Sequence, residues 1–158
     1  MKIINHTLDS TLASIDAAEG AACDCAKQAG LEAPAVEGIG FAVREITANA
    51  IVHGNRYDSR KKVFVAVSRT PSRLEIAISD QGAGFNPSSV PDPLSSDALL
   101  RTSGRGLYLA RAFTDELHVR RGDLCGATVV LVKYVNESVQ EQAPDQNPAS
   151  TNGATCYR

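Results

Sequence analysis

Glu45 and Asn49 are a carboxylate and an amide four positions apart in a segment predicted to be helical. This spacing places both side chains on one helix face, at the edge of the apolar stripe, and His53 continues that face. The amide oxygen of Asn49 suits Mg²⁺, which prefers hard oxygen ligands. The carboxylate of Glu45 can accept a proton from an attacking hydroxyl group or orient that group. The alternative is an ordinary polar helix edge, because polar pairs at this spacing are common.

Asp80 follows an apolar strand and opens a glycine-rich segment that contains Gly82 and Gly84. An ionised carboxylate only accepts hydrogen bonds. It therefore matches the exocyclic amine of adenine, whereas guanine carries an acceptor at the same place. The two glycines allow unusual backbone angles and a close approach to a ligand. A simple turn with a solvated aspartate would have the same composition.

A third block opens a predicted helix and consists of Gly104, Arg105, Gly106 and Leu107. Free backbone amides at a helix start favour phosphate binding. The glycines allow the segment to close over a phosphate, and the guanidinium group could add a charged contact. A glycine pair before a helix is weak evidence when it stands alone.

The fourth block is Gly126-Ala127-Thr128, at the start of a predicted strand. The hydroxyl group of Thr128 could hydrogen-bond a purine edge or fix Asp80, although threonine is also common in strands for structural reasons. In this order, the four blocks supply a metal ligand with a base, an adenine partner, a phosphate wrap and a closing hydroxyl group. Together they predict a pocket for magnesium-bound ATP.

The secondary structure around these four blocks can be predicted from hydrophobic periodicity and turn residues. The segment Thr70–Ser72 is too short for a parallel crossover, so the strands on either side should form an antiparallel hairpin. The expected fold is α+β, a two-layer sandwich with a mostly antiparallel sheet and helices on one face. We expect strands at 2–8, 62–69, 74–79, 116–121 and 128–134, and helices from 9 or 10 to about 30, from 34 to about 53, and from 105 to about 114.

Two of the expected helices carry an apolar line toward the core. Asp9 or Ser10 is the expected N-cap of the first helix. The line on the first helix is Leu12, Ile15, Glu19, Ala22, Ala26 and Ala29. The line on the second helix is Val36, Ile39, Val43, Ile46 and Ala50.

Length and composition narrow the class of protein. The 158 residues are 43% hydrophobic with a net charge of −2, which predicts one domain and gives no reason to expect nucleic acid or membrane affinity. There is no signal-peptide core and no apolar run of roughly 18 residues, so we expect a cytoplasmic protein. The domain should span 1–135, with a disordered polar tail at 136–158. The long segment 82–104 indicates a mobile functional loop.

The blocks together resemble the GHKL ATPase superfamily, which has the Bergerat ATP-binding fold. Within it, the chain is most similar to the small bacterial anti-sigma factor/serine-protein kinases. The resemblance covers about residues 3–134. It rests on residues 44–54 (Arg-Glu-Ile-Thr-Ala-Asn-Ala-Ile-Val-His-Gly), 80–85 (Asp-Gln-Gly-Ala-Gly-Phe) and 104–109 (Gly-Arg-Gly-Leu-Tyr-Leu).

The resemblance implies a role for most of these residues. Asn49 would bind Mg²⁺ and Glu45 would be the catalytic carboxylate. Asp80 would read the adenine amine, with Gly82 and Gly84 beside it. By the same resemblance, the lid and phosphate region would contain Gly104 and Gly106, and the adenine end would be lined by Thr128.

The family's function implies the partners. Its members hold a sigma factor and phosphorylate a serine or threonine of an anti-anti-sigma (STAS-type) protein, and they are commonly homodimers. One alternative is an ATP-binding regulatory module that sequesters a partner without phosphoryl transfer. A second is a fragment of a sensor histidine kinase, which needs a phospho-accepting histidine on a helix; before Ile39 the chain holds only His6, outside a predicted helix.

Overall fold

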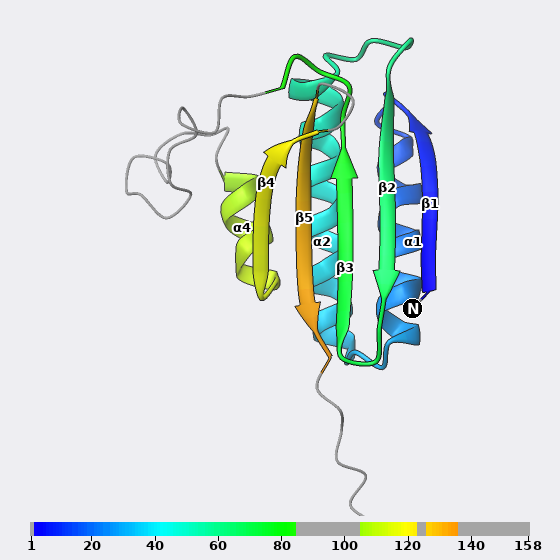
Figure 1. Ribbon diagram of the computed structural model, residues 1–158, viewed down its shortest axis with the longest axis vertical. Coiled ribbons are helices and arrows are strands. Elements are labelled where there is room, and N and C mark those ends of the chain that lie inside the picture. The colour runs from blue at the N-terminus through cyan, green and yellow to red at the C-terminus, as the bar shows by residue number, and fades with distance from the viewer. Residues whose placement is uncertain (1, 85–104, 123–125, 136–158) are drawn as a thin grey trace, which may run out of the picture.

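The computed structural model describes residues 2–84, 105–122 and 126–135. They form a five-stranded sheet covered on one face by helices (Figure 1). The strands are β1 (Lys2–Asp9), β2 (Lys62–Arg69), β3 (Arg73–Ser79), β4 (Glu116–Arg121) and β5 (Ala127–Tyr134). The helices are α1 (Ser14–Gln28), α2 (Ala33–Asn49) and α4 (Arg105–Phe113), and η1 (Ala50–Gly54) continues α2.

The sheet is antiparallel throughout, in the order β1-β2-β3-β5-β4. The expected hairpin of β2 and β3 is confirmed, as is the α+β two-layer class. The β4–β5 hairpin adds to the sheet through β5, so that Ser79 at the end of β3 lies opposite Thr128. This pairing brings the segment after β3 next to the start of β5.

The core lies between the sheet and the helices. Alternate residues of β2 and β3 point to the helices and are buried, as the period of a strand requires. The apolar line expected for the second helix is confirmed, because all five of its residues are buried. Buried strand residues of this core are Val63, Val65, Val67, Leu74, Ile76 and Ile78.

The prediction for the start of the first helix was wrong. Helix α1 begins only at Ser14, and Leu12 is 54% exposed. A turn at residues 11–13 precedes the helix and supplies carbonyl acceptors for the N–H groups of Ser14 and Ile15. No side chain caps this helix, and the hydroxyl group of Ser10 instead donates to the carbonyl of Lys61. The buried residues of α1 are Ile15, Ala18, Ala22, Cys25 and Ala26, so neither Glu19 nor Ala29 belongs to the buried line.

The second helix ends close to the expected position but in a different geometry. Its last five residues form η1, a π-helical turn in which the N–H of Asn55 donates to the carbonyl of Ala50 at 2.8 Å. Such wide turns within α-helices occur frequently at functional sites. Here the turn lies at the end of the helix that carries Glu45 and Asn49.

Candidate active site

A cavity of about 310 Å³ lies between the helix layer and one end of the sheet. Its wall is largely apolar, formed by Ile46, Ile78 and Val129 among others. Four of the residues predicted from the sequence line it: Asn49, Asp80, Gly84 and Leu107. The volume falls within the range of about 300–1,000 Å³ that is usual for small-molecule sites. Two polar groups 31 positions apart in the sequence therefore open into one cavity.

Asp80 is the polar side chain at the sheet end of the cavity, and it is 7% exposed. Its Oδ1 accepts hydrogen bonds from the backbone N–H of Gly82 at 2.8 Å and of Ala127 at 3.2 Å. Its own N–H donates to the carbonyl of Ala127 at 3.0 Å. Within the described residues, Oδ2 accepts no hydrogen bond. The carboxylate is thus fixed by one oxygen and has the other available for a donor in the cavity.

Three glycines pack directly around this carboxylate. A Cβ atom on Gly54 would lie 2.4 Å from Cγ of Asp80, and one on Gly126 would lie 1.9 Å from the Asp80 carbonyl oxygen. A Cβ on Gly82 would lie 2.3 Å from the carbonyl oxygen of Gly54. The ends of η1 and β3 and the start of β5 can meet here only because none of the three carries a side chain.

Glu45 and Asn49 are both partly buried, and they face the first turn of α4. A Cβ atom on Gly106 would lie 2.7 Å from Oε2 of Glu45 and 3.4 Å from Nδ2 of Asn49. The start of a helix carries free N–H groups and a positive dipole end, which suit phosphate. Arg105 begins α4, but its side chain and the whole of Gly104 lie outside the described residues.

Thr128 does not line the cavity. It is 3% exposed, and its hydroxyl group pairs with that of Ser79 at 2.8 Å. We expected Thr128 either to fix Asp80 or to contact a purine. Asp80 is instead held by the backbone N–H of Ala127, and the contact with a purine stays a prediction. Phe85, the expected lid at residues 86–103 and the expected tail at residues 136–158 lie outside the described residues.

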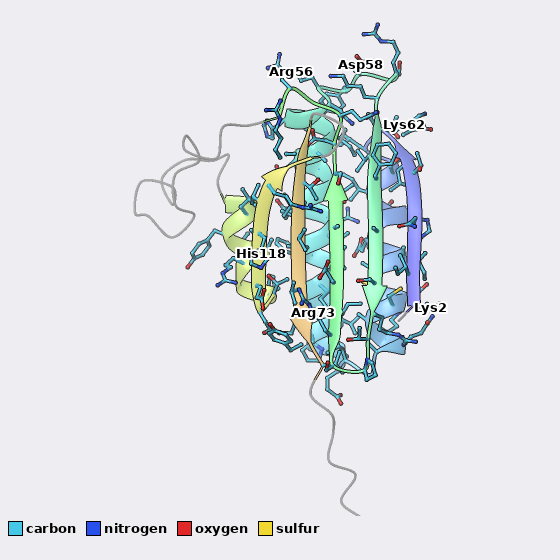
Figure 2. All side chains as sticks on the ribbon, viewed as in Figure 1. Lys2, Arg56, Asp58, Lys62, Arg73 and His118 are labelled. Atoms are coloured by element: carbon cyan, nitrogen blue, oxygen red, sulfur yellow. The ribbon has the colours of Figure 1, made fainter. Side chains whose placement is uncertain are left out.

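Three residues of the site were missed or given no role by the sequence analysis. His53 and Arg56 line the cavity, and Asn55 is fully buried beside it. Arg56 and Tyr57 have φ angles of 55° and 58°, a region that residues other than glycine seldom adopt. Arg56 lies at the same end of the sheet as Lys62, far from Lys2 and Arg73 (Figure 2). In the sequence, Gly54 and Asn55 indicate only a helix end.

The residues present fit the groups that the sequence blocks predicted. The cavity combines an apolar wall with a fixed carboxylate, which suits a purine, and the amide of Asn49 opens into the same cavity. The space beside Glu45 and Asn49 is closed by a glycine at a helix start, where a phosphate can approach the backbone. An amide oxygen is a hard ligand of the kind that Mg²⁺ accepts together with phosphate oxygens.

Comparisons with known proteins show the family of this chain. Residues 8–133 match the model of the histidine kinase-like ATPase domain. The chain is 32% identical over 98 residues to the anti-sigma F factors of Bacillus thuringiensis and Bacillus cereus, covering 61% of this chain and 67% of theirs. The chain belongs to the anti-sigma factor family of the GHKL, or histidine kinase-like, ATPases.

Two solved structures share the fold. One contains the RsbU and RsbW domains of a Mycobacterium tuberculosis protein, with a TM-score of 0.60 and 20% identity, covering 84% of this chain and 32% of that chain. The other is the mycobacterial sensor histidine kinase MprB, with a TM-score of 0.54 and 18% identity, covering 83% of this chain and 97% of that chain. No helix in the described part of the chain has the length and apolarity to cross a membrane.

Proposed function

We propose that this chain is a Mg-ATP-dependent serine/threonine-protein kinase that also acts as an anti-sigma factor. It binds a sigma factor and phosphorylates an anti-anti-sigma protein of the STAS type. The observation that carries the proposal is the meeting of Asn49 and Asp80 in one cavity. The family membership and the Bacillus relatives named anti-sigma F factor support the choice of partner.

Asp80 recognises the adenine base. Its Oδ1 is held by two backbone N–H groups, so Oδ2 keeps a fixed direction and accepts a hydrogen bond from the adenine amine. Guanine presents an acceptor at that place and is rejected, because two acceptors would face each other in a buried site. The apolar side chains Ile78 and Val129 pack against the base.

Glu45 and Asn49 act at the phosphate end of the site, where the transfer takes place. Asn49 would hold Mg²⁺ through its amide oxygen, and the ion would supply charge neutralisation at the phosphates. Glu45 orients the hydroxyl group of the substrate serine or threonine and accepts its proton. The start of α4 at Gly106 brings backbone N–H groups to the same place. In phosphoryl transfer the protein mainly positions groups and stabilises charge, which suits a site with few reactive side chains.

The test uses the full chain with Mg-ATP, calorimetry and labelled γ-phosphate. Glu45→Gln should keep ATP affinity and lose transfer to the anti-anti-sigma protein, whereas Asp80→Asn should lose ATP affinity. A Glu45→Gln variant that transfers phosphate at the wild-type rate would contradict the assigned role. If the wild type binds ATP and its partner but transfers no label, the alternative module that sequesters a partner without chemistry is correct.

The partners are identified by retention from a cell extract, first with ATP and then with ADP. We expect a sigma factor in one pool and a small anti-anti-sigma protein in the other. Light scattering tests the expected homodimer, and fractionation tests the cytoplasmic location. Retention of ribosomal or membrane components alone would contradict the proposal.

A further inference from the structure

Asn55 is a completely buried polar residue that does not line the cavity. Both N–H groups of its side-chain amide donate hydrogen bonds, and the amide oxygen accepts one. Nδ2 donates to Oγ of Ser10 at 2.7 Å and to the carbonyl of Lys62 at 2.9 Å, and Oδ1 accepts from the backbone N–H of Gln81 at 2.8 Å. One side chain therefore joins the end of β1, the start of β2 and the turn after β3.

The turn after β3 is held at a second point. The side-chain Oε1 of Gln81 accepts from the backbone N–H of Lys62 at 2.7 Å. Gln81 is thus bonded through its backbone to Asn55 and through its side chain to β2. Gln81 lies between Asp80 and Gly82, so these bonds also fix the N–H of Gly82, which donates to Oδ1 of Asp80.

The π-helical turn η1 places Asn55 in this position. The bond from the Asn55 N–H to Ala50 closes the wide turn, and the N–H of Tyr57 reaches back to the carbonyl of Ile51 at 3.0 Å. Asn49 and His53 face the cavity from the same helical segment, while Asn55 points into the protein. Because of this wide turn, one helical segment both lines the cavity and anchors the turn after β3.

We propose that Asn55 is a positioning residue for adenine recognition. By holding the N–H of Gln81, it sets the conformation of the Asp80–Gly82 turn and with it the direction of Oδ2 of Asp80. The inference rests on the proposed nucleotide function and deepens it: discrimination of the 6-amino group depends on a residue that never touches the base. Its bonds to Ser10 and Lys62 anchor the amide, and its bond to Gln81 transmits the position.

The experiment measures two dissociation constants in the presence of Mg²⁺, for ATP and for purine riboside triphosphate, which lacks the 6-amino group. Their ratio reports the contact with Asp80. A hydrogen bond to a charged acceptor predicts a wild-type preference for ATP of about tenfold or more. In Asn55→Ala we expect the ratio to fall to about threefold or less, mainly through loss of ATP affinity.

Ser10→Ala is the matched control. It removes one bond to the same amide but leaves the bond between Asn55 and Gln81, so it should lower stability and keep the ratio. If Asn55→Ala does not fold, Gly20→Ala is added, because an added methyl group there meets open space in α1 and favours the helix.

The outcomes separate the two proposals. A wild type that binds neither nucleotide contradicts the proposed function itself. A wild type that binds both equally shows that Asp80 does not read the amine, and the role of Asn55 is then wrong as well. A wild type with a clear preference that folded Asn55→Ala retains in full overturns the positioning role alone.

Discussion

Gly54 and Asp80 are in direct contact, with room for no side chain between them. A methyl group on Gly54 would lie 2.4 Å from Cγ and 2.6 Å from Oδ2 of Asp80. The end of the helical segment that carries Asn49 thus closes one side of the carboxylate, close to both of its oxygens. The position of this carboxylate therefore depends on the absence of a side chain at Gly54.

Gly54→Ala should therefore weaken ATP binding. The new methyl group must displace the carboxylate, and we expect ATP affinity to fall about tenfold or more, with overpacking costing about 1–3 kcal/mol of stability. Calorimetry and urea unfolding measure the two effects. Gly20→Ala is the control, because nothing lies within 4 Å of its new methyl group. It should raise stability by about 0.5–1 kcal/mol and leave ATP affinity unchanged. Equal ATP affinity in both variants would contradict the role of this contact.

Gly106→Ala should separate binding from chemistry. Its methyl group would lie 2.7 Å from Oε2 of Glu45, which is the end of a flexible side chain and can move. We expect a folded protein with nearly normal ATP affinity, because none of the three atoms nearest to the added methyl group belongs to Asp80. Phosphoryl transfer should fall about ten- to a hundredfold, since small misplacements of a reacting group are costly. Single-turnover transfer measures this, and an unchanged rate would show that the position of Glu45 does not limit the reaction.

Thr47→Val should stabilise the protein. Thr47 is completely buried, and its Oγ1 has no hydrogen-bond partner within the described residues. Valine has nearly the same shape and removes the unsatisfied group, so the free energy of unfolding should rise by about 1 kcal/mol. Urea unfolding measures this. A loss of stability would show that the hydroxyl group has a partner, such as a buried water molecule.

Asp115→Asn should change the pH dependence of stability. Burial alone would raise the pKa of Asp115, but the bonds from the Tyr134 N–H and the Lys133 ammonium outweigh it and lower the pKa. A lowered pKa in the folded state means that the stabilisation is present above the unfolded value of about 3.9 and is lost as pH falls through the folded value. The wild type should exceed Asp115→Asn by about 1 kcal/mol at most at pH 6, because solvent screens the group.

The difference should then shrink as pH falls below about 4, which urea unfolding at a series of pH values can follow. Asp24→Asn is the control. Asp24 forms an exposed ion pair with Lys27 at 3.8 Å, and its removal should change stability by a few tenths of a kcal/mol at most. A constant difference between wild type and Asp115→Asn across the pH range would contradict the assignment.

The elements could be predicted because their signals are local. Strands β2 and β3 alternate buried and partly buried residues, as expected for strands with one face on the core. Proline and glycine mark the turns, and the bounds of β2 and β4 are the expected ones. The end of α2 was also placed well, but no sequence pattern indicates that its last turn is π-helical. The start of α1 was misplaced because a turn at residues 11–13, rather than a polar side chain, supplies the first acceptors.

The site could be predicted only in part, because its contacts join distant segments. Asn49 and Asp80 were expected in one pocket from the order of the blocks and their family resemblance, and the structure brings both to one cavity. The bonds of Asn55 reach Ser10, Lys62 and Gln81, and their pairing depends on the folded sheet. Before the fold is known, an asparagine after a glycine indicates only the end of a helix.

The helices and strands fall into two groups, those that line the cavity and those that do not. All of the cavity's described walls come from α2 with η1, the loop that follows, β3 with the segment after it, α4, β4 and β5, whereas α1, β1 and β2 contribute none. We therefore expect substitutions at exposed positions of α1 and β1 to leave the affinity for a ligand in the cavity unchanged. During evolution, the exposed residues of α1 and β1 are therefore freer to change than the residues that line the cavity.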